Sequence, residues 1–191
     1  MISKKFIKKT KKKGTLFWIE GFSGAGKTSI SRVTAKILRK KISNLVLIQG
    51  NEMRSLLQLK GFSKKERISA SNYSSELIKF LTNNGINVMY TVLCLNNRTR
   101  KIYKNKIDNF LQIYVDSSVN QIIKKNLKPQ IYKLKKNIVG VDIKPDYPKK
   151  NNIVIKNNFS KKIKELGTNL AEEIIICCNN KLWFSCLKQK K

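Results

Sequence analysis

The chain has 191 residues, and its 41 Lys and Arg against 11 Asp and Glu give a formal net charge of +30 at pH 7. It contains no histidine, which excludes Ser-His-Asp and Cys-His catalysis, histidine metal ligands and imidazole acid–base chemistry. Hydrophobic residues make up 41% of the chain. A single domain of this size can therefore bury a core and fold despite its charge.

The cysteines and the apolar segments indicate the compartment. No pair has the C-x-x-C spacing and no pattern is typical of a disulfide framework, which favours free thiols in a reducing environment. No apolar run approaches the roughly 20 residues of a membrane span, and the basic start of the chain lacks the apolar region of a signal peptide. We therefore predict a soluble, cytoplasmic protein. The cysteines are Cys94, Cys177, Cys178 and Cys186.

The positive charge favours weak, salt-sensitive binding to polyanions. Only six of the basic residues are Arg, whereas bidentate recognition of phosphates and bases favours Arg over Lys. The sequence also lacks the pattern of a recognition helix or of an aromatic RNA-binding strand. We therefore predict no specific nucleic-acid partner, although a basic nucleic-acid binder stays open as an alternative.

Strands and helices are predicted to alternate along one α/β domain over residues 14–178, between a disordered basic arm over 1–13 and a basic tail over 179–191. Because strands that alternate with helices form parallel sheets, we expect a parallel sheet with helices on both faces. In the tail, apolar residues among lysines favour docking onto the domain over membrane-surface binding. The apolar periodicity predicts strands over 16–19, 45–48, 87–95, 110–115 and 153–155, and helices over 29–41, 52–59, 69–84 and 160–177.

A glycine-rich loop between the first strand and the first helix carries the clearest functional signal. Residues 21–28 match the pattern G-x-x-x-x-G-K-[ST], in which backbone N–H groups and a helix N-terminus hold phosphates. Lys27 is expected to reach the β- and γ-phosphates, and the Thr28 hydroxyl to coordinate Mg²⁺. The sequence thus predicts an ATP and Mg²⁺ site formed by Gly21, Ser23, Gly24, Ala25, Gly26, Lys27, Thr28 and Ser29.

Three segments make the chain resemble the adenylylsulfate kinases over residues 14–157. They are GTLFWIEGFSGAGKTSISRVTAKIL, GNEMRSLLQLKGFSKKER and KNIVGVDIKPDYP. The resemblance implies a three-layer α/β P-loop kinase with a parallel sheet of about five strands and its site at the carboxyl ends of the strands. It further implies transfer of the ATP γ-phosphate to the ribose 3′-hydroxyl of adenylylsulfate, in sulfate assimilation. The resemblance is also compatible with a homodimer.

The resemblance also suggests an acceptor site. Arg54 and Arg67 match two arginines that hold the acceptor, and Phe62 matches an aromatic residue that stacks on its base. Two guanidinium groups can grip a phosphosulfate and a ring suits a purine, although ordinary core packing is the alternative for Phe62. Ile138 stands where a second stacking Phe is usual.

The lid segment of the family survives only in part. Lys125 and Lys128, with Tyr132 after them, stand in place of its usual motif. Both lysines carry a charge that can neutralise a transferring phosphate, and Lys128 is assigned to the acceptor site.

Two departures from the family concern catalysis. Gln49 and Asn51 stand where aspartates are usual, so Asn51 joins Lys27 as a catalytic candidate although an amide accepts no proton. Glu20 and Glu52 are alternative carboxylates. Because phosphoryl transfer depends mainly on positioning and charge neutralisation, we expect slower activity rather than none.

Three other functions stay open beside an adenylylsulfate kinase. The altered acceptor pocket, in which Ala70 and Asn72 replace usual family residues, favours a kinase for another nucleotide conjugate in surface-polysaccharide modification, such as cytidine diphosphoramidate. Loss of the aspartates favours a nucleotide-binding protein without catalysis. The net charge leaves the nucleic-acid binder described above.

Overall fold

A computed structural model describes residues 12–93, 95–133 and 136–180. Cys94, Cys186 and nearly all of the predicted basic arm and C-terminal tail lie outside these residues. Cys177 and Cys178 are free thiols, as predicted. Among the described helices, none combines the length and the apolar character needed to cross a bilayer.

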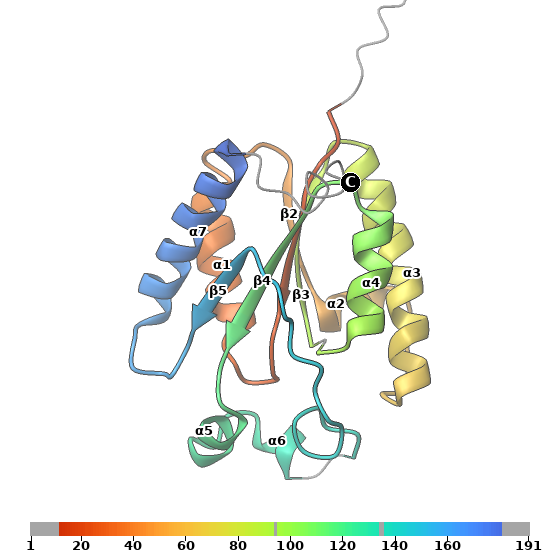
Figure 1. The fold of residues 1–191 in the computed structure, drawn as a ribbon, viewed down its shortest axis with the longest axis vertical. Coiled ribbons are helices and arrows are strands. Elements are labelled where there is room, and N and C mark those ends of the chain that lie inside the picture. Colours follow the sequence, from red (N-terminus) through yellow and green to blue (C-terminus); the bar gives the residue numbers. More distant parts are fainter. Residues whose placement is uncertain (1–11, 94, 134–135, 181–191) are drawn as a thin grey trace, which may run out of the picture.

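The centre of the fold is a five-stranded parallel sheet with the order β2-β3-β1-β4-β5 (Figure 1). β1 lies in the middle, all five of its residues are buried, and its continuous apolar sequence is typical of a strand covered on both faces. This confirms the predicted fold class. The strands are β1 (Leu16–Glu20), β2 (Leu45–Gln49), β3 (Asn87–Val92), β4 (Phe110–Asp116) and β5 (Ile153–Lys156).

Two pairs of helices cover the sheet, one pair on each face (Figure 1). α1 (Lys27–Leu38) and α7 (Ile163–Asn179) pack together on one face, and α3 (Lys64–Asn83) and α4 (Asn97–Lys106) on the other. On the second face an aromatic core forms around Trp18, whose ring centroid lies 4.3 Å from that of Tyr103. The result is the three-layer arrangement that the sequence predicted.

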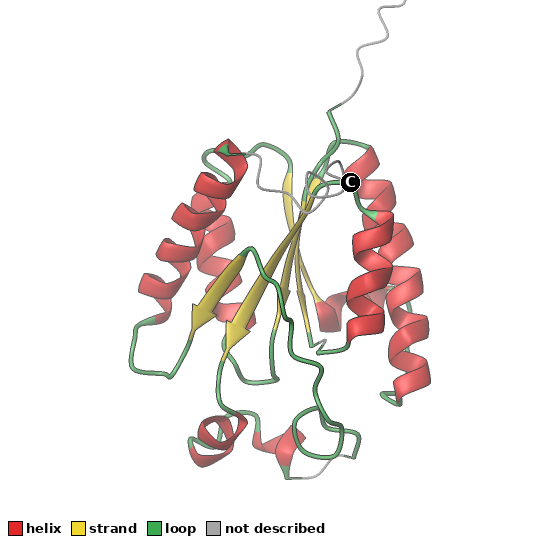
Figure 2. Cartoon of the chain, viewed as in Figure 1, coloured by secondary structure: helices red, strands yellow, loops and turns green. Residues whose placement is uncertain are grey.

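Three short helices lie near the carboxyl ends of the strands. α2 (Gly50–Leu56) follows β2 directly, and α5 (Val119–Lys124) and α6 (Pro129–Tyr132) lie beyond the arrowheads of the sheet (Figure 2). We call residues 119–132, which comprise α5, α6 and the turn between them, the lid segment. It brings a lysine-rich stretch of the sequence close to the glycine-rich loop over residues 21–28, which we call the phosphate loop.

Several predicted boundaries were wrong, for local reasons. α3 begins at Lys64 rather than at residue 69, because Ser63 and Glu66 form a capping box at its N-terminus. α2 ends at Leu56 rather than at residue 59, since the chain turns through Gln58, whose φ is 50°. α1 starts two residues earlier than predicted, α7 starts three later, and β3 ends at residue 92 rather than 95.

Candidate active site

A cleft of about 1230 Å³ opens at the carboxyl edge of the sheet. It is bounded by the phosphate loop, the start of α2, the first half of α3, the segment after β3, the lid segment and residues 136–146. In parallel α/β sheets this edge is where ligands bind. Among the predicted site residues, those that line the cleft are Ser23, Gly24, Gly26, Lys27, Thr28, Ser29, Asn51, Arg54, Phe62, Arg67, Lys128 and Ile138.

The backbone of the phosphate loop depends on glycine, because a side chain at these positions would be strained and would clash with neighbouring atoms. Gly24 and Gly26 have φ angles of 80° and 88°, and a Cβ at Gly24 would lie 2.8 Å from Cγ2 of Ile122 in the lid segment. α1 begins at Lys27, directly after the loop, so its N-terminal amides and positive dipole end face the cleft mouth. The loop therefore fits a polyphosphate.

Lys27 closes the loop on itself. Its side chain is buried, and its Nζ donates a hydrogen bond of 2.6 Å to the Phe22 carbonyl oxygen. Burial lowers the pKa of Lys27 to about 7, the charge of Glu20 opposes this shift, and the charge of Lys128 adds to it. A nearby anion would raise that pKa again, so the geometry favours binding of a negatively charged group.

Asn157 supports the phosphate loop from behind, and no sequence motif predicted this role. It is 2% exposed, its Nδ2 donates a 3.0 Å hydrogen bond to the Ala25 carbonyl, and its Oδ1 accepts one from the Phe159 amide. It also lines a second, shallower hollow of about 320 Å³ between residues 116–121 and 156–161. Asn157 therefore joins the phosphate loop to the end of β5.

Glu20 does not serve as a carboxylate in the cleft. It is fully buried, and both of its oxygens lie 2.9 Å from Nε of Arg100, while Gln112 Nε2 donates a 2.5 Å hydrogen bond to Oε1. Burial raises the pKa of Glu20 because it outweighs the opposing effects of Arg100 and Gln112. No pattern in the sequence predicted this buried ion pair.

Arg100 also connects the root of the phosphate loop to the opposite wall of the cleft. Its guanidinium donates to the Asp146 carbonyl and, at 2.7 Å, to Oδ1 of Asn97. The Asp146 carboxylate accepts a 3.2 Å hydrogen bond from the Asn97 amide at the start of α4. One buried cation thus holds β1, α4 and the segment around residue 146 together.

Glu52 is occupied in a helix cap. Its carboxylate accepts hydrogen bonds of 2.8 and 2.9 Å from the backbone amide and the side-chain amide of Gln49. Gln49 and Asn51 both line the cleft. The cleft therefore presents the neutral amides of Gln49 and Asn51 at the positions where the family usually has aspartates.

The three predicted acceptor residues before and within α3 form one cluster. The guanidinium of Arg54 lies 4.3 Å from the Phe62 ring centroid and that of Arg67 lies 5.5 Å from it. Phe62 is 45% exposed, so the core-packing alternative is wrong. Arg67 also donates to the carbonyls of Phe62 and Asn137, at 2.7 and 3.0 Å.

Ile138 follows Asn137 directly and forms an aliphatic part of the same wall. It is 6% exposed and lines the cleft. The acceptor side thus offers the Phe62 ring with two guanidinium groups over it, and the branched aliphatic side chain of Ile138 lines the same cleft. Of the two lid lysines, Lys128 lines the cleft, whereas Lys125 is exposed and is not among the described lining residues.

Comparisons with known proteins agree with this geometry. A family model for adenylylsulphate kinase matches residues 13–156. A cytidine diphosphoramidate kinase from Campylobacter jejuni subsp. jejuni serotype O:2 is 28% identical over 163 residues, which cover 82% of this chain and 96% of that protein. An adenylyl-sulfate kinase from Rippkaea orientalis is 28% identical over 137 residues, which cover 69% and 76%.

Solved structures show the same fold. The Mycobacterium tuberculosis APS kinase in complex with AMPPNP and APS superposes with a TM-score of 0.74 at 21% sequence identity, covering 85% of this chain and 98% of that one. This likeness concerns the arrangement of the chain and leaves the acceptor open.

Proposed function

The chain belongs to the adenylylsulphate kinase family and is an ATP-dependent phosphotransferase. From that premise we propose that it transfers the γ-phosphate of ATP to a hydroxyl of a pyrimidine nucleotide conjugate of the cytidine diphosphoramidate kind. The observation that carries this choice is the acceptor wall, where Ile138 lines the cleft in place of the second stacking Phe that is usual in the family, and Phe62 keeps the other stacking position. A smaller base needs less ring surface than a purine does.

On the donor side, the phosphate loop holds the triphosphate through its backbone amides, and Lys27 places its ammonium group on the phosphates. The glycine cradle and the buried Nζ of Lys27 support this assignment. The second hollow is lined by Asn157, whose side chain is hydrogen-bonded to the loop at Ala25, and we assign the nucleoside part of the donor to this hollow.

Magnesium fits the residues assigned to this donor set through neutral groups. The Thr28 hydroxyl and the Asn51 amide are cleft-lining oxygen donors, and both are ligand types that Mg²⁺ accepts beside phosphate oxygens. When bound, the ion would neutralise charge between the β- and γ-phosphates. The cleft-lining carboxylates of Asp142 and Asp146 accept hydrogen bonds from the backbone amides of Ile138 and Asn97, so we expect weaker binding of Mg²⁺ and a slower reaction than in a site with aspartates after β2.

On the acceptor side, the guanidinium groups of Arg54 and Arg67 lie over Phe62, so a base that packs against the exposed part of this ring brings its attached diphosphate within reach of both groups. Arginine suits such anions because its planar fork can form two parallel hydrogen bonds. The match to the Campylobacter jejuni relative, which covers 82% of this chain and 96% of that protein, supports the same choice.

Adenylylsulfate is the second candidate acceptor. It is favoured by Arg54, Phe62 and Arg67, which keep the places that the family resemblance assigns to acceptor binding and which do meet in space. In that case the protein would act in sulfate assimilation.

A direct assay separates the two candidates. Purified protein, ATP and Mg²⁺ are incubated with cytidine diphosphoramidate or with adenylylsulfate, and the phosphorylated products are identified by mass spectrometry. We expect a higher kcat/KM for the cytidine conjugate, and Ile138→Phe should shift the ratio toward the purine by several-fold. A wild-type preference for adenylylsulfate would overturn the proposal in favour of the second candidate.

A further inference from the structure

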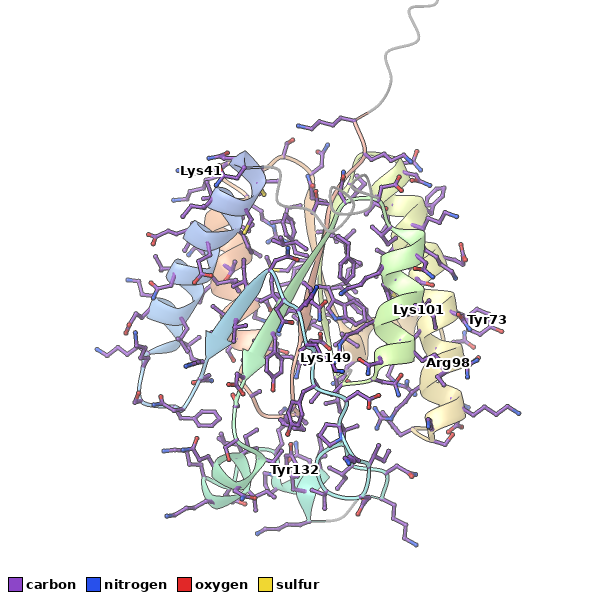
Figure 3. The ribbon with its side chains drawn as sticks, in the orientation of Figure 1. Lys41, Tyr73, Arg98, Lys101, Tyr132 and Lys149 are labelled. Carbon is purple, nitrogen blue, oxygen red and sulfur yellow. The ribbon has the colours of Figure 1, made fainter. Side chains whose placement is uncertain are left out.

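The lid segment touches the phosphate loop at two described points. Ile122 and Leu127 pack against Gly24, where a Cβ would lie 2.8 Å from one and 3.5 Å from the other. Four residues after Lys128, the hydroxyl of Tyr132 donates a 2.7 Å hydrogen bond to the carbonyl oxygen of Ser23. Figure 3 shows Tyr132 below the sheet, among the side chains of the lid segment.

Lys128 has an unusual backbone conformation for a residue that is not glycine. Its φ and ψ are 59° and 49°, in the left-handed region, which costs a lysine on the order of 1 kcal/mol. Such a conformation persists only where neighbouring contacts enforce it, and it is a frequent sign of a functional position. Lys128 also lines the cleft.

A single helical turn ties Lys128 to Tyr132. The Lys128 carbonyl accepts hydrogen bonds from the amides of Ile131 and Tyr132, at 2.9 and 3.3 Å, and Pro129 fixes the first φ angle of that turn. A displacement of the Tyr132 ring would therefore move Lys128. The hydroxyl bond to Ser23 is the polar contact that fastens this turn to the phosphate loop.

The charge of Lys128 acts on the phosphate loop. It disfavours the ammonium form of Lys27, which is part of why the pKa of Lys27 is lowered. Two cations held near each other without an intervening anion repel, and a triphosphate between them would relieve that repulsion.

We propose that Tyr132 is a positioning residue whose hydrogen bond to Ser23 fixes Lys128 over the phosphate loop, where the Lys128 ammonium acts with Lys27 on the nucleotide phosphates. The proposal depends on nucleotide binding at the loop and is independent of which acceptor the enzyme uses. In this proposal the Tyr132–Ser23 hydrogen bond attaches the lid segment to the phosphate loop.

The test is a double-mutant cycle on Tyr132→Phe and Lys128→Gln, with the ATP-dependent steps measured without any acceptor. The readouts are the Kd for a fluorescent ATP analogue and the rate of ATP hydrolysis by water. Tyr132→Phe removes one oxygen and keeps the ring, so the loss of one hydrogen bond should weaken analogue binding about three- to ten-fold. In the Lys128→Gln background the same change should have less than half that effect.

Two further measurements separate positioning from stability. The urea midpoint of Tyr132→Phe should match that of the wild type, because the hydroxyl lies outside the main core, while amide exchange in residues 119–132 should become faster. Tyr73→Phe is the matched control, since Tyr73 is 60% exposed on α3 and points away from the lid segment (Figure 3).

Equal effects of Tyr132→Phe in both backgrounds, an unchanged Kd in Tyr132→Phe, or the same loss in Tyr73→Phe would each overturn the proposal. Failure of every candidate acceptor in the product assay would instead count against the proposed function alone, since these readouts need no acceptor.

Discussion

The buried pair of Glu20 and Arg100 gives the sharpest quantitative prediction. Their side chains are 0% and 5% exposed, so Arg100→Met would leave the Glu20 carboxylate in the core with a hydrogen bond from the Gln112 amide. Removing one member of a buried pair typically costs about 3–5 kcal/mol. We expect Arg100→Met to lower the free energy of unfolding by about that amount at pH 8.0.

Protonation of Glu20 limits this loss and makes it depend on pH. Neutralising a carboxyl of ordinary pKa 4.5 costs about 1.4 kcal/mol at pH 5.5 and about 4.8 kcal/mol at pH 8.0. A folded state with a raised Glu pKa binds more protons than the unfolded state, so its stability falls as the pH rises above 4.5. The loss of unfolding free energy in Arg100→Met should therefore shrink to about 2 kcal/mol at pH 5.5. This value includes the cost of the hydrogen bonds that Arg100 no longer makes.

Urea unfolding followed by circular dichroism at pH 5.5 and 8.0 measures both values. The double variant Glu20→Gln with Arg100→Met removes both charges and should lose the pH dependence. Arg98→Met, an exposed position two residues away on α4 (Figure 3), should change stability by less than about 0.5 kcal/mol. A loss in Arg100→Met below 1 kcal/mol, or one that is equal at both pH values, would refute the reasoning.

Three further predictions concern the cleft. Lys27→Ala should abolish phosphoryl transfer while Glu52→Gln keeps most of it, because Lys27 is the residue proposed to contact the phosphates and Glu52 caps a helix; equal ATP turnover in wild type and Lys27→Ala would contradict the site. Asn51→Asp should raise kcat several-fold at limiting Mg²⁺, since a carboxylate adds the charge that the amide lacks; a lower kcat at every Mg²⁺ concentration would speak against this placement. Asn157→Ala should raise the KM for ATP roughly five- to ten-fold by freeing the Ala25 carbonyl from its buried partner, and calorimetric titration with a non-hydrolysable ATP analogue should show the same change in Kd.

The sequence by itself determined the fold class and the phosphate loop. Local signals were sufficient there, because a buried apolar strand such as residues 16–19, a run of glycines with Lys27 and Thr28, and an apolar helical period all lie within about 25 consecutive residues. The parallel direction of the strands followed from the alternation of strands and helices, whereas their order in the sheet was visible only in the structure. Element ends were less predictable, since caps such as Ser63 with Glu66 compete with apolar periodicity.

Only the tertiary structure decided which charged and polar residues work together. Glu20 and Arg100 lie 80 positions apart, and Ser23 and Tyr132 lie 109 apart, so no spacing in the sequence could pair them. The structure moved Glu20 from a candidate carboxylate to a buried ion pair, and it placed Phe62 outside the core with two guanidinium groups over its ring. The physical reason is that the interactions of a charged side chain depend on its distance from other groups and on its burial. Both are set by the folded structure, which decides whether the charge is paired, desolvated or available to a substrate.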